Sequence, residues 1–565
     1  MTLAAGAQIE FNPENCGSGM KFTAEGGFVG PSGAITAATL SQFATLTDTV
    51  NFMLEMSEDG KTIEVKSSAN VAANAYWTGG GAAGDMDDPA NWKCVNSAGD
   101  VIENGLPAGS TAVWAREGDG ATSFAIPDGY TPNWASFNVG GNVSLSAACD
   151  WSAVSAVKLA NGATLDLNGN NLKAMHIEVA SGTASVVNTA SGTKPLLWRE
   201  NVTHETALVG TGVTVDTVNV EVKLVNSEDL TIEANIASSL DATFEQNAGD
   251  VTATANPFGI GTGGHTGSYT INGGTLTSSK SLVTGWGGTG AFRQVAGTVT
   301  AQSYLTIGYQ GGTGTYRLEG GTLLIGGGLS LGELSGGNGT FWQTDGVVTN
   351  YGVCFVGNGG GTGGRYIMEG GSLLIDRQAL RIGRLSPGEF SISNGTVDVK
   401  YQTWVGDGAT GAGTLCVKTG GTLITPFISP NENGENTVEF NGGTVKATDL
   451  TATNPFLNNL TNVLFGAGGV TIDAAGHDLT IANCTFKAAP GVKAITFANG
   501  GTLTFTDTVL KLVGKPSGHY VFAKATGNGT FSGVPSLDVK GYSIRLSSDR
   551  KRVVVVRKGL TIIAR

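Results

Sequence analysis

The sequence predicts an all-β protein, a right-handed parallel β-helix of roughly 22–26-residue coils with terminal β-hairpin modules. First, Gly-Gly-Thr or a degenerate form of it recurs through residues 257–450 in steps of 22 to 26 residues. Second, another glycine, from Gly261 to Gly406, closes the preceding apolar run in steps of 23 to 26 residues. Third, no helical pattern lies inside the repeat. Such a period is typical of a solenoid whose unit is one turn of β-strands.

One coil, residues 304–325, shows how each turn is expected to be built. Its three strand-like runs are Tyr304–Ile307, Thr315–Leu318 and Thr322–Ile325, and glycine-containing corners separate them. Glycine adopts positive φ and permits close backbone approach without steric cost, which is what a tight corner requires. We therefore expect three strands and three corners in each triangular coil.

An aromatic column runs through the clean repeats. The position four residues before each glycine pair is aromatic six times in succession, at Tyr269, Phe292, Tyr316, Phe341, Tyr366 and Phe390. Because equivalent residues of successive coils lie about 4.8 Å apart, the column predicts a stacked ladder inside the core. Two positions further on, Ile271, Leu318, Met368 and Ile392 fit the same inward face, whereas Gln294 and Gln343 do not.

The repeats "IGYQGGTGTYRLEGGTLLIG" and "VGNGGGTGGRYIMEGGSLLI" resemble the short glycine-rich repeats of bacterial autotransporter passengers and PEP-CTERM-sorted surface proteins. The resemblance covers residues 257–450. It implies a right-handed parallel β-helix and a location outside the cell or on its surface. It does not imply a particular reaction.

Composition excludes several classes of function. The 565 residues carry a net charge of −13 that is spread thinly, so nucleic acid is not an expected partner. No run of 18 apolar residues occurs, and no membrane-spanning helix is expected. The six cysteines lack C-x-x-C spacing, which argues against zinc and favours buried thiols. A bridge between Cys94 and Cys149 is the alternative.

Residues 1–70 and 516–565 are expected to be copies of one closing β-module. The segments "FTAEGGFVG" and "NFMLEMSEDGKTIEVK" near the start match "FAKATGNGTFSG" and "GYSIRLSSDRKRVVVV" near the end. We therefore expect the native polypeptide to be longer than this chain, which carries neither a signal peptide nor an anchor. The four valines at 553–556 would invite pairing as a terminal strand, with the flanking basic residues as gatekeepers.

Residues 71–135 are expected to form a Trp-rich capping or linker segment. Its stretch "AYWTGGGAAGDMDDPANW" resembles the opening of the same surface proteins, and Trp77 and Trp92 bracket a loop with Asp85, Asp87 and Asp88. The carboxylates are candidate Ca²⁺ ligands, but the twelve-residue ligand pattern is missing and a solvated turn is favoured. The tryptophans are candidate sugar-stacking residues, although closing the core is the favoured role.

The candidate chemistry lies on the β-helix expected over residues 136–515. Glu319 and Glu369 share one column two coils apart, hence about 9.6 Å apart at the strand spacing. Inverting glycosidases separate their carboxylates by about 6.5–9.5 Å. Against catalysis, other polar residues hold the same place in other coils. Arg293 and Arg317 stack in the preceding outward column and are candidates for binding an acidic sugar.

The sequence therefore favours an extracellular or cell-surface structural or adhesive module, a non-catalytic rigid stalk or passenger without a cofactor. A solenoid buries its core through repetition and leaves its outer faces free to vary. The expected partners are surface glycans or other copies of the chain. The alternative is a carbohydrate-binding or polysaccharide-degrading β-helix protein, but an enzyme needs convergent titratable groups in a cleft.

Overall fold

The computed structural model describes residues 1–4, 9–11, 20–31, 33–46, 52–67, 71–116, 126–127, 129–192, 194–408, 410–432, 434–449 and 455–558. The chain is all-β, and its parallel strands stack as a β-solenoid of about 17 turns spaced about 24 residues apart. This confirms the predicted fold class. Two compact units are present: Met1–Arg199 with Thr206–Lys223, and Glu200–Glu205 with Leu224–Arg565.

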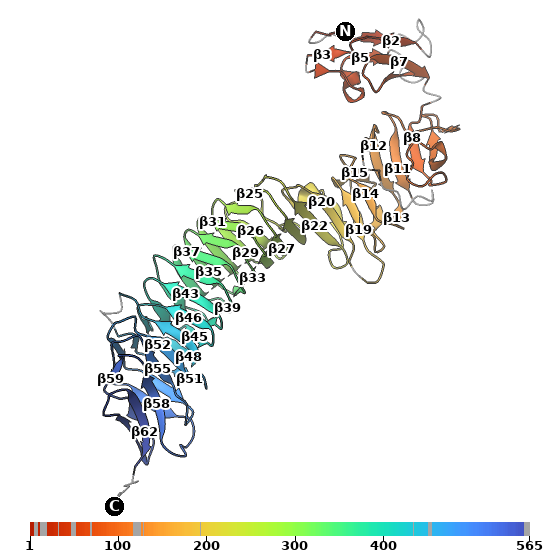
Figure 1. The fold of residues 1–565 in the computed structure, drawn as a ribbon. Helices are drawn as coiled ribbons and strands as arrows, with labels where there is room; N and C mark the ends of the chain where they lie inside the picture. The colour runs from red at the N-terminus through yellow and green to blue at the C-terminus, as the bar shows by residue number, and fades with distance from the viewer. Residues whose placement is uncertain are drawn as a thin grey trace, which may run out of the picture. The chain divides into compact units, whose positions relative to one another are not determined.

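The second unit consists of three sheets, whose strands form a continuous stack (Figure 1). The sheet that carries the aromatic column, here the ladder sheet, contains β24 (Ala242–Gln246), β27 (Thr266–Ile271), β30 (Thr289–Gln294), β33 (Thr313–Leu318), β36 (Asn338–Gln343), β39 (Gly363–Met368), β42 (Gly388–Ile392), β45 (Ala412–Lys418), β48 (Glu435–Asn441), β51 (Val463–Phe465), β54 (Thr485–Ala488), β57 (Val509–Leu512) and β60 (Ser536–Leu537).

The strands that follow the glycine pairs form a second sheet, here the Gly-pair sheet. It contains β23 (Leu230–Ile232), β25 (Asp250–Ala253), β28 (Thr275–Ser278), β31 (Thr298–Ala301), β34 (Thr322–Ile325), β37 (Val347–Asn350), β40 (Ser372–Ile375), β43 (Gly395–Val399), β46 (Gly421–Ile424), β49 (Gly443–Lys446), β52 (Val470–Asp473), β55 (Ile495–Ala498), β58 (Tyr520–Ala525), β62 (Arg552–Arg557) and β61 (Tyr542–Leu546).

The third sheet completes each triangular coil. It contains β26 (Phe258–Thr262), β29 (Leu282–Trp286), β32 (Tyr304–Tyr309), β35 (Gly328–Glu333), β38 (Val353–Asn358), β41 (Leu380–Ile382), β44 (Thr403–Val405), β47 (Ile428–Ser429), β50 (Leu457–Asn458), β53 (Leu479–Ala482), β56 (Thr502–Thr506) and β59 (Thr530–Ser532). The three strands expected in residues 304–325 are therefore β32, β33 and β34. β32 ends two residues later and β33 begins two residues earlier than expected.

The first unit is built from shorter strands. They are β1 (Ile9–Phe11), β2 (Lys21–Thr23), β3 (Val29–Gly30), β4 (Gly33–Ala34), β5 (Ala44–Leu46), β6 (Phe52–Met56), β7 (Thr62–Ser67), β8 (Asn74–Trp77), β9 (Trp92–Val95), β10 (Val101–Ile102), β11 (Ala112–Arg116), β12 (Ser136–Gly140), β13 (Asn142–Ser144), β14 (Cys149–Trp151), β15 (Val157–Leu159), β16 (Thr164–Asp166), β17 (Leu172–Ala174), β18 (Ile177–Val179), β19 (Ala184–Val187) and β21 (Val213–Val215).

The parallel stack that continues into the β-helix begins inside the expected capping segment, because β11 pairs in parallel with both β8 and β12. The strands β20 (Leu196–Glu200) and β22 (Glu221–Asn226) cross the limit between the two units. The helices of the described residues are the short 3-10 turns η1 (Ala37–Gln42), η3 (Pro89–Asn91) and η4 (Glu205–Ala207). None of the described helices is long and apolar enough to cross a membrane.

The glycine that closes each third-sheet run marks a close approach to the ladder sheet. Gly261, Gly285, Gly308, Gly332, Gly357, Gly383 and Gly406 all have φ between 66° and 80°. At Gly308, an added Cβ would lie 2.0 Å from the carbonyl oxygen of Asn338. Both the left-handed backbone and the lack of space exclude other residues, which explains why this glycine recurs in every clean coil.

The aromatic column lies inside the solenoid. Its six side chains are at most 1% exposed. Successive rings, from Tyr269 to Phe390, stack with centroids 4.6 to 5.1 Å apart and planes inclined by 2° to 18°. Phe244 of the preceding coil extends the stack at 4.8 Å. The stacking follows from the in-register pairing of the ladder-sheet strands, for example Tyr316 opposite Phe341.

The prediction that Gln294 and Gln343 do not fit the inward face is wrong, because both side chains are fully buried. The Oε1 atom of Gln294 accepts a hydrogen bond of 2.6 Å from the hydroxyl of Tyr316 in the next coil. Its Nε2 atom donates to the carbonyl oxygens of Gly297 and Thr322. The buried amide is therefore paired at both ends.

The same arrangement recurs in two other places. Gln246 accepts from the Tyr269 hydroxyl at 2.7 Å, and Gln343 accepts from Tyr366 at 2.6 Å. From β24 to β39, coils with Phe and Gln thus alternate with coils that carry Tyr and an apolar residue. The inward pattern of this region has a two-coil unit.

The two terminal modules share one hairpin design. β6 and β7 pair antiparallel, as do β61 and β62. In the first hairpin, Asp59 accepts from Ser57 Oγ and from the Lys61 amide. In the second, Asp549 accepts from Ser547 Oγ and from the Lys551 amide. The sheet orders β2-β7-β6 and β58-β62-β61 also correspond.

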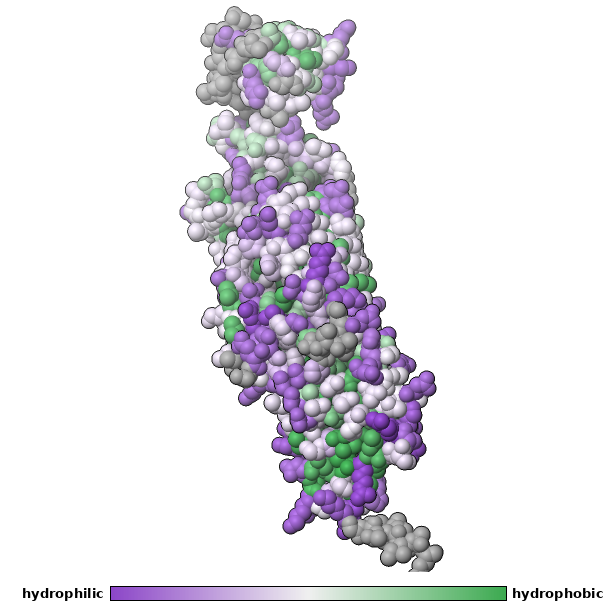
Figure 2. Space-filling view, turned by 90° about the vertical axis from the view of Figure 1, so that its left-hand side faces the viewer, coloured by the Kyte–Doolittle hydropathy of each residue, from purple (hydrophilic) through white to green (hydrophobic). Residues whose placement is uncertain are grey.

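The four valines do not form an exposed terminal strand, contrary to expectation. β62 lies between β58 and β61, so it is paired on both sides. Val553 and Val555 are fully buried, whereas Val554 and Val556 are partly exposed. Figure 2 shows hydrophobic residues gathered near the C-terminal end of the second unit, while hydrophilic residues spread over most of the rest of that face.

Candidate functional site

The four candidate residues on the ladder sheet belong to one chain of polar contacts. Arg293 of β30 donates through Nε and Nη2 to the two carboxylate oxygens of Glu319, at 3.1 and 2.7 Å. Arg317 of β33 donates to the same carboxylate. The guanidinium of Arg317 also lies over the ring of Trp342, 4.4 Å from its centroid. The Trp342 indole then donates to Glu369 at 2.9 Å. This chain is here called the outer ladder.

The electrostatics of the outer ladder do not suit a catalytic acid. The hydrogen bond from Arg293 is the largest of several contacts that lower the pKa of Glu319. A general acid needs the opposite change, a raised pKa that keeps its proton at the working pH. The contacts of Arg293 and Arg317 with Glu319 also offset the positive charge that an acidic sugar would seek. Solvent-exposed ion pairs of this kind each stabilise a fold by about 0.2–1 kcal/mol.

Trp77 and Trp92 lie in the core of the first unit, where they are 4% and 7% exposed. Their rings meet edge to face at 4.9 Å, and the Trp92 indole donates to the Met86 carbonyl at 2.9 Å. Trp92 also lies 5.9 Å from the ring of Trp134. Sugar stacking needs an exposed ring face, so these side chains are placed to close the core.

The aspartates of the same loop hold its backbone. Asp88 accepts from the amide of Ala82 at 2.7 Å and caps η3 through the amide of Ala90 at 2.9 Å. The hydrogen bond from Ala82 is the main cause that lowers the pKa of the Asp88 carboxyl. Asp85 accepts from the amide of Asp87. Among the described residues, no group of three or more His, Cys, Asp or Glu side chains is arranged to hold a metal ion.

The cysteines that the structure describes, Cys94, Cys149, Cys354, Cys416 and Cys484, are buried and free. The alternative of a bridge between Cys94 and Cys149 is therefore wrong. Burial raises the pKa of the Cys94 thiol to about 11 and that of Cys149 to about 12. Thiols with raised pKa values are poor nucleophiles at neutral pH. Cys16 lies outside the described residues.

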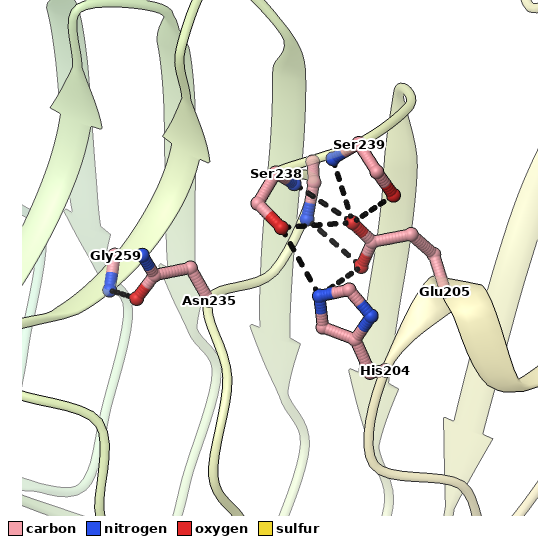
Figure 3. Close-up of polar contacts among 7 residues, drawn as sticks. His204, Glu205, Asn235, Ser238, Ser239 and Gly259 are labelled. Atoms are coloured by element: carbon pink, nitrogen blue, oxygen red, sulfur yellow. Dashed lines mark hydrogen bonds and ion pairs between the residues drawn. The ribbon is translucent and has the colours of Figure 1, made fainter.

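A buried carboxylate that sequence reasoning missed lies at the start of the second unit (Figure 3). Glu205 is fully buried, and its carboxylate accepts the three successive amides of Ala237, Ser238 and Ser239 at 2.8 to 3.2 Å. The Nε2 atom of His204 lies 3.3 Å from the same carboxylate and 3.1 Å from the hydroxyl of Ser238. Histidine, carboxylate and serine thus converge on one point.

Their geometry differs from that of a catalytic triad. A triad places the carboxylate on one imidazole nitrogen and the nucleophile on the other. Here Glu205 and Ser238 both meet Nε2 of His204. The carboxylate instead satisfies a row of amides beside Ala237, whose φ is 53°. Glu205 therefore anchors a left-handed turn. These contacts join Glu205 to residues more than 30 positions away, and no local sequence motif predicts them.

A second missed cluster lies on the outer face of the third sheet. Arg381 of β41 lies between two aromatic rings, 4.0 Å from the centroid of Trp404 and 5.7 Å from that of Phe355. Its guanidinium pairs at 3.2 Å with Asp407, which is only 2% exposed. Phe355, Arg381 and Trp404 are partners in successive strands. Register thus builds stacked polar and aromatic columns outside the solenoid as well as inside it.

The fold and these contacts define the class of the protein as a β-solenoid with ion-paired and aromatic columns on its outer faces. In comparisons with known proteins, no family model, curated protein or solved structure matches the chain.

Proposed function

We propose that the chain is an extracellular or cell-surface structural and adhesive module, a non-catalytic scaffold. The observation that carries this proposal is the state of Glu319, whose oxygens accept hydrogen bonds from Arg293 and Arg317. The contacts that lower its pKa favour the ionised form, which has no proton to give to a leaving group. Glu369 is in turn bound by an indole. The candidate catalytic pair, Glu319 and Glu369, is thus better explained as part of the outer ladder.

The core supports the same proposal. Its aromatic stack and Tyr–Gln pairs are complete within the chain, so the second unit needs no ligand to fill its interior. Outward side chains are then free to serve adhesion. The resemblance of the repeats to those of surface proteins supports the proposed extracellular or cell-surface location. Surface glycans or other copies of the chain are the proposed partners.

A carbohydrate-binding role is the second candidate function. Tyr304 and Tyr401 are 52% and 54% exposed, so much of each phenol side chain is open to a ligand. Tyrosine combines an apolar ring with a polar hydroxyl and is well suited to a hydrated ligand. This candidate is compatible with adhesion and incompatible with a purely inert stalk.

The test compares binding and turnover on the same purified chain. Wild type, Glu319→Gln and Glu369→Gln are incubated with a panel of polysaccharides and applied to a glycan array. We expect no release of reducing ends or unsaturated sugars from any of the three proteins, and adhesion unchanged in both variants. Product release by wild type that either variant abolishes would contradict the proposal.

A further inference from the structure

We propose that the corner between the Gly-pair sheet and the third sheet binds an extended 1,4-linked polysaccharide, whose sugar rings stack on Tyr304, Tyr351 and Tyr401. The proposal rests on the adhesive function proposed above and names its ligand class and site. The site is separate from the outer ladder and from the Arg381 cluster.

The three tyrosines occupy equivalent corners of alternate coils. Tyr304 is the first residue of β32, Tyr351 lies two residues before β38, and Tyr401 lies two residues before β44. Each follows the Gly-pair strand of its own coil, namely β31, β37 or β43. Their exposed fractions are 52%, 37% and 54%. Two coils separate each tyrosine from the next, a rise of about 9.6 Å along the solenoid. Around the corner the register offsets them, because Tyr351 precedes the column of Tyr304 by two residues and Tyr401 precedes it by one.

The corner between Tyr304 and Tyr351 carries no side chains, because it consists of Gly326, Gly327 and Gly328. An added Cβ on Gly328 would lie 3.4 Å from Cε1 of Tyr304. The phenol ring therefore lies beside bare backbone, and nothing at this corner separates it from a ligand that continues to Tyr351.

The corner between Tyr351 and Tyr401 carries an exposed guanidinium, which a neighbouring carboxylate offsets in charge but contacts through one nitrogen. The Arg377 side chain is 71% exposed, and its guanidinium lies 5.3 Å from the centroid of the Tyr351 ring. Its Nε atom is 3.5 Å from the Asp376 carboxylate. The planar guanidinium has several donors and can bind a carboxylate through two of them. An acidic sugar placed beside Tyr351 would meet such donors.

The spacing favours a polysaccharide over a protein partner. A protein interface needs a contiguous apolar core, whereas here glycine and polar corners interrupt the aromatic rings. In an extended 1,4-linked chain, every second sugar presents the same face, and two sugars span roughly the two-coil rise of about 9.6 Å. In a polymer that runs along the solenoid axis, every second sugar ring can therefore stack on a tyrosine.

The experiment uses two polymers with one backbone, neutral hydroxyethyl cellulose and acidic carboxymethyl cellulose, in affinity electrophoresis of the full chain. Each single variant, Tyr304→Ala, Tyr351→Ala and Tyr401→Ala, should weaken binding about two- to tenfold, and the triple variant should not be retarded. Arg377→Ala should weaken retardation by the acidic polymer and leave that by the neutral polymer unchanged. Tyr309→Ala, a partly exposed tyrosine on the third sheet, is the matched control.

Two results would overturn the site: wild type that neither polymer retards, or a triple variant that binds as well as wild type and the control. These results leave the adhesive function intact if beads coated with the chain still adhere to glycan surfaces. Conversely, polysaccharide cleavage by wild type would contradict the non-catalytic function, and loss of binding in the triple variant would still support the site. Thermal unfolding of each variant checks that the fold is preserved.

Discussion

At the scale of single residues, the Tyr–Gln pairs show how a polar group is accommodated inside a stacked aromatic core. The phenol of Tyr316 donates to Gln294, and the amide of Gln294 donates to two backbone carbonyls. Burial raises the pKa of Tyr316 well above its usual value, so the hydroxyl remains a donor. Each such pair couples a coil that carries Phe and Gln to the Tyr coil that follows it, which favours the observed order of Phe and Tyr coils over the reverse order.

Replacing one member of the pair should therefore cost more than replacing both. Gln294→Leu leaves the Tyr316 hydroxyl without its acceptor and removes the side-chain donor from two carbonyl oxygens, so we expect a loss of about 1–3 kcal/mol in the free energy of unfolding. Adding Tyr316→Phe removes the unpaired hydroxyl and should recover part of the loss. Urea denaturation of the single and double variants measures the coupling. Strictly additive effects would show that the pair contributes no coupling.

At the scale of the coil, the glycines are the residues from which the sequence best predicts the structure. The column from Gly261 to Gly406 predicts the corners because backbone φ and close approach allow no other residue there. The inward glutamines could not be predicted from a one-coil period, since their partner is a tyrosine in the next coil. The role of Glu205 could not be predicted either, because its partners from Ala237 to Ser239 bind it through backbone amides, which any residue other than proline can supply. The valines of β62 were misjudged because β61, which precedes β62 in the chain, pairs outside it.

Two glycines of the same coil, Gly308 and Gly311, distinguish the two reasons for a glycine at a corner, namely positive φ and close approach of another backbone segment. Gly308→Ala should lower the free energy of unfolding by more than about 3 kcal/mol, because positive φ and contact with the Asn338 carbonyl act together. Gly311 also has positive φ, at 80°, but its nearest neighbour would be 3.9 Å from the added Cβ. Gly311→Ala should therefore cost only about 1–2 kcal/mol. Equal losses in thermal or urea unfolding would rule out the close approach as the cause.

At the scale of the whole molecule, the columns on the outer surface depend on strand register. The outer ladder and the Arg381 cluster both arise because equivalent positions of successive coils lie one strand spacing apart. The corner tyrosines share a corner of alternate coils without sharing one register position. Repetition makes such columns without a dedicated pocket, which suits adhesion to a repetitive polymer. The sequence predicted the repeat and the outward columns, but side-chain partners such as Glu319 with Arg293 required the structure.

In-register stacking of the second unit can be measured with pairs of spin labels on the outward column of the Gly-pair sheet. Thr252, Thr277, Thr300, Leu324, Thr349, Leu374 and Asp398 are successive partners in this column. Labels replace pairs of these residues through introduced cysteines, in a Cys16→Ser background in which the other native thiols are buried. Electron paramagnetic resonance then gives the distance between the two labels.

Labels at 252 and 349, four coils apart, should lie about 19 Å apart, and labels at 252 and 398, six coils apart, about 29 Å apart. The increment of about 4.8 Å per coil is the expected signature. Distances that do not increase with the number of coils, or that scatter widely for each pair, would contradict the in-register solenoid on which both functional proposals depend.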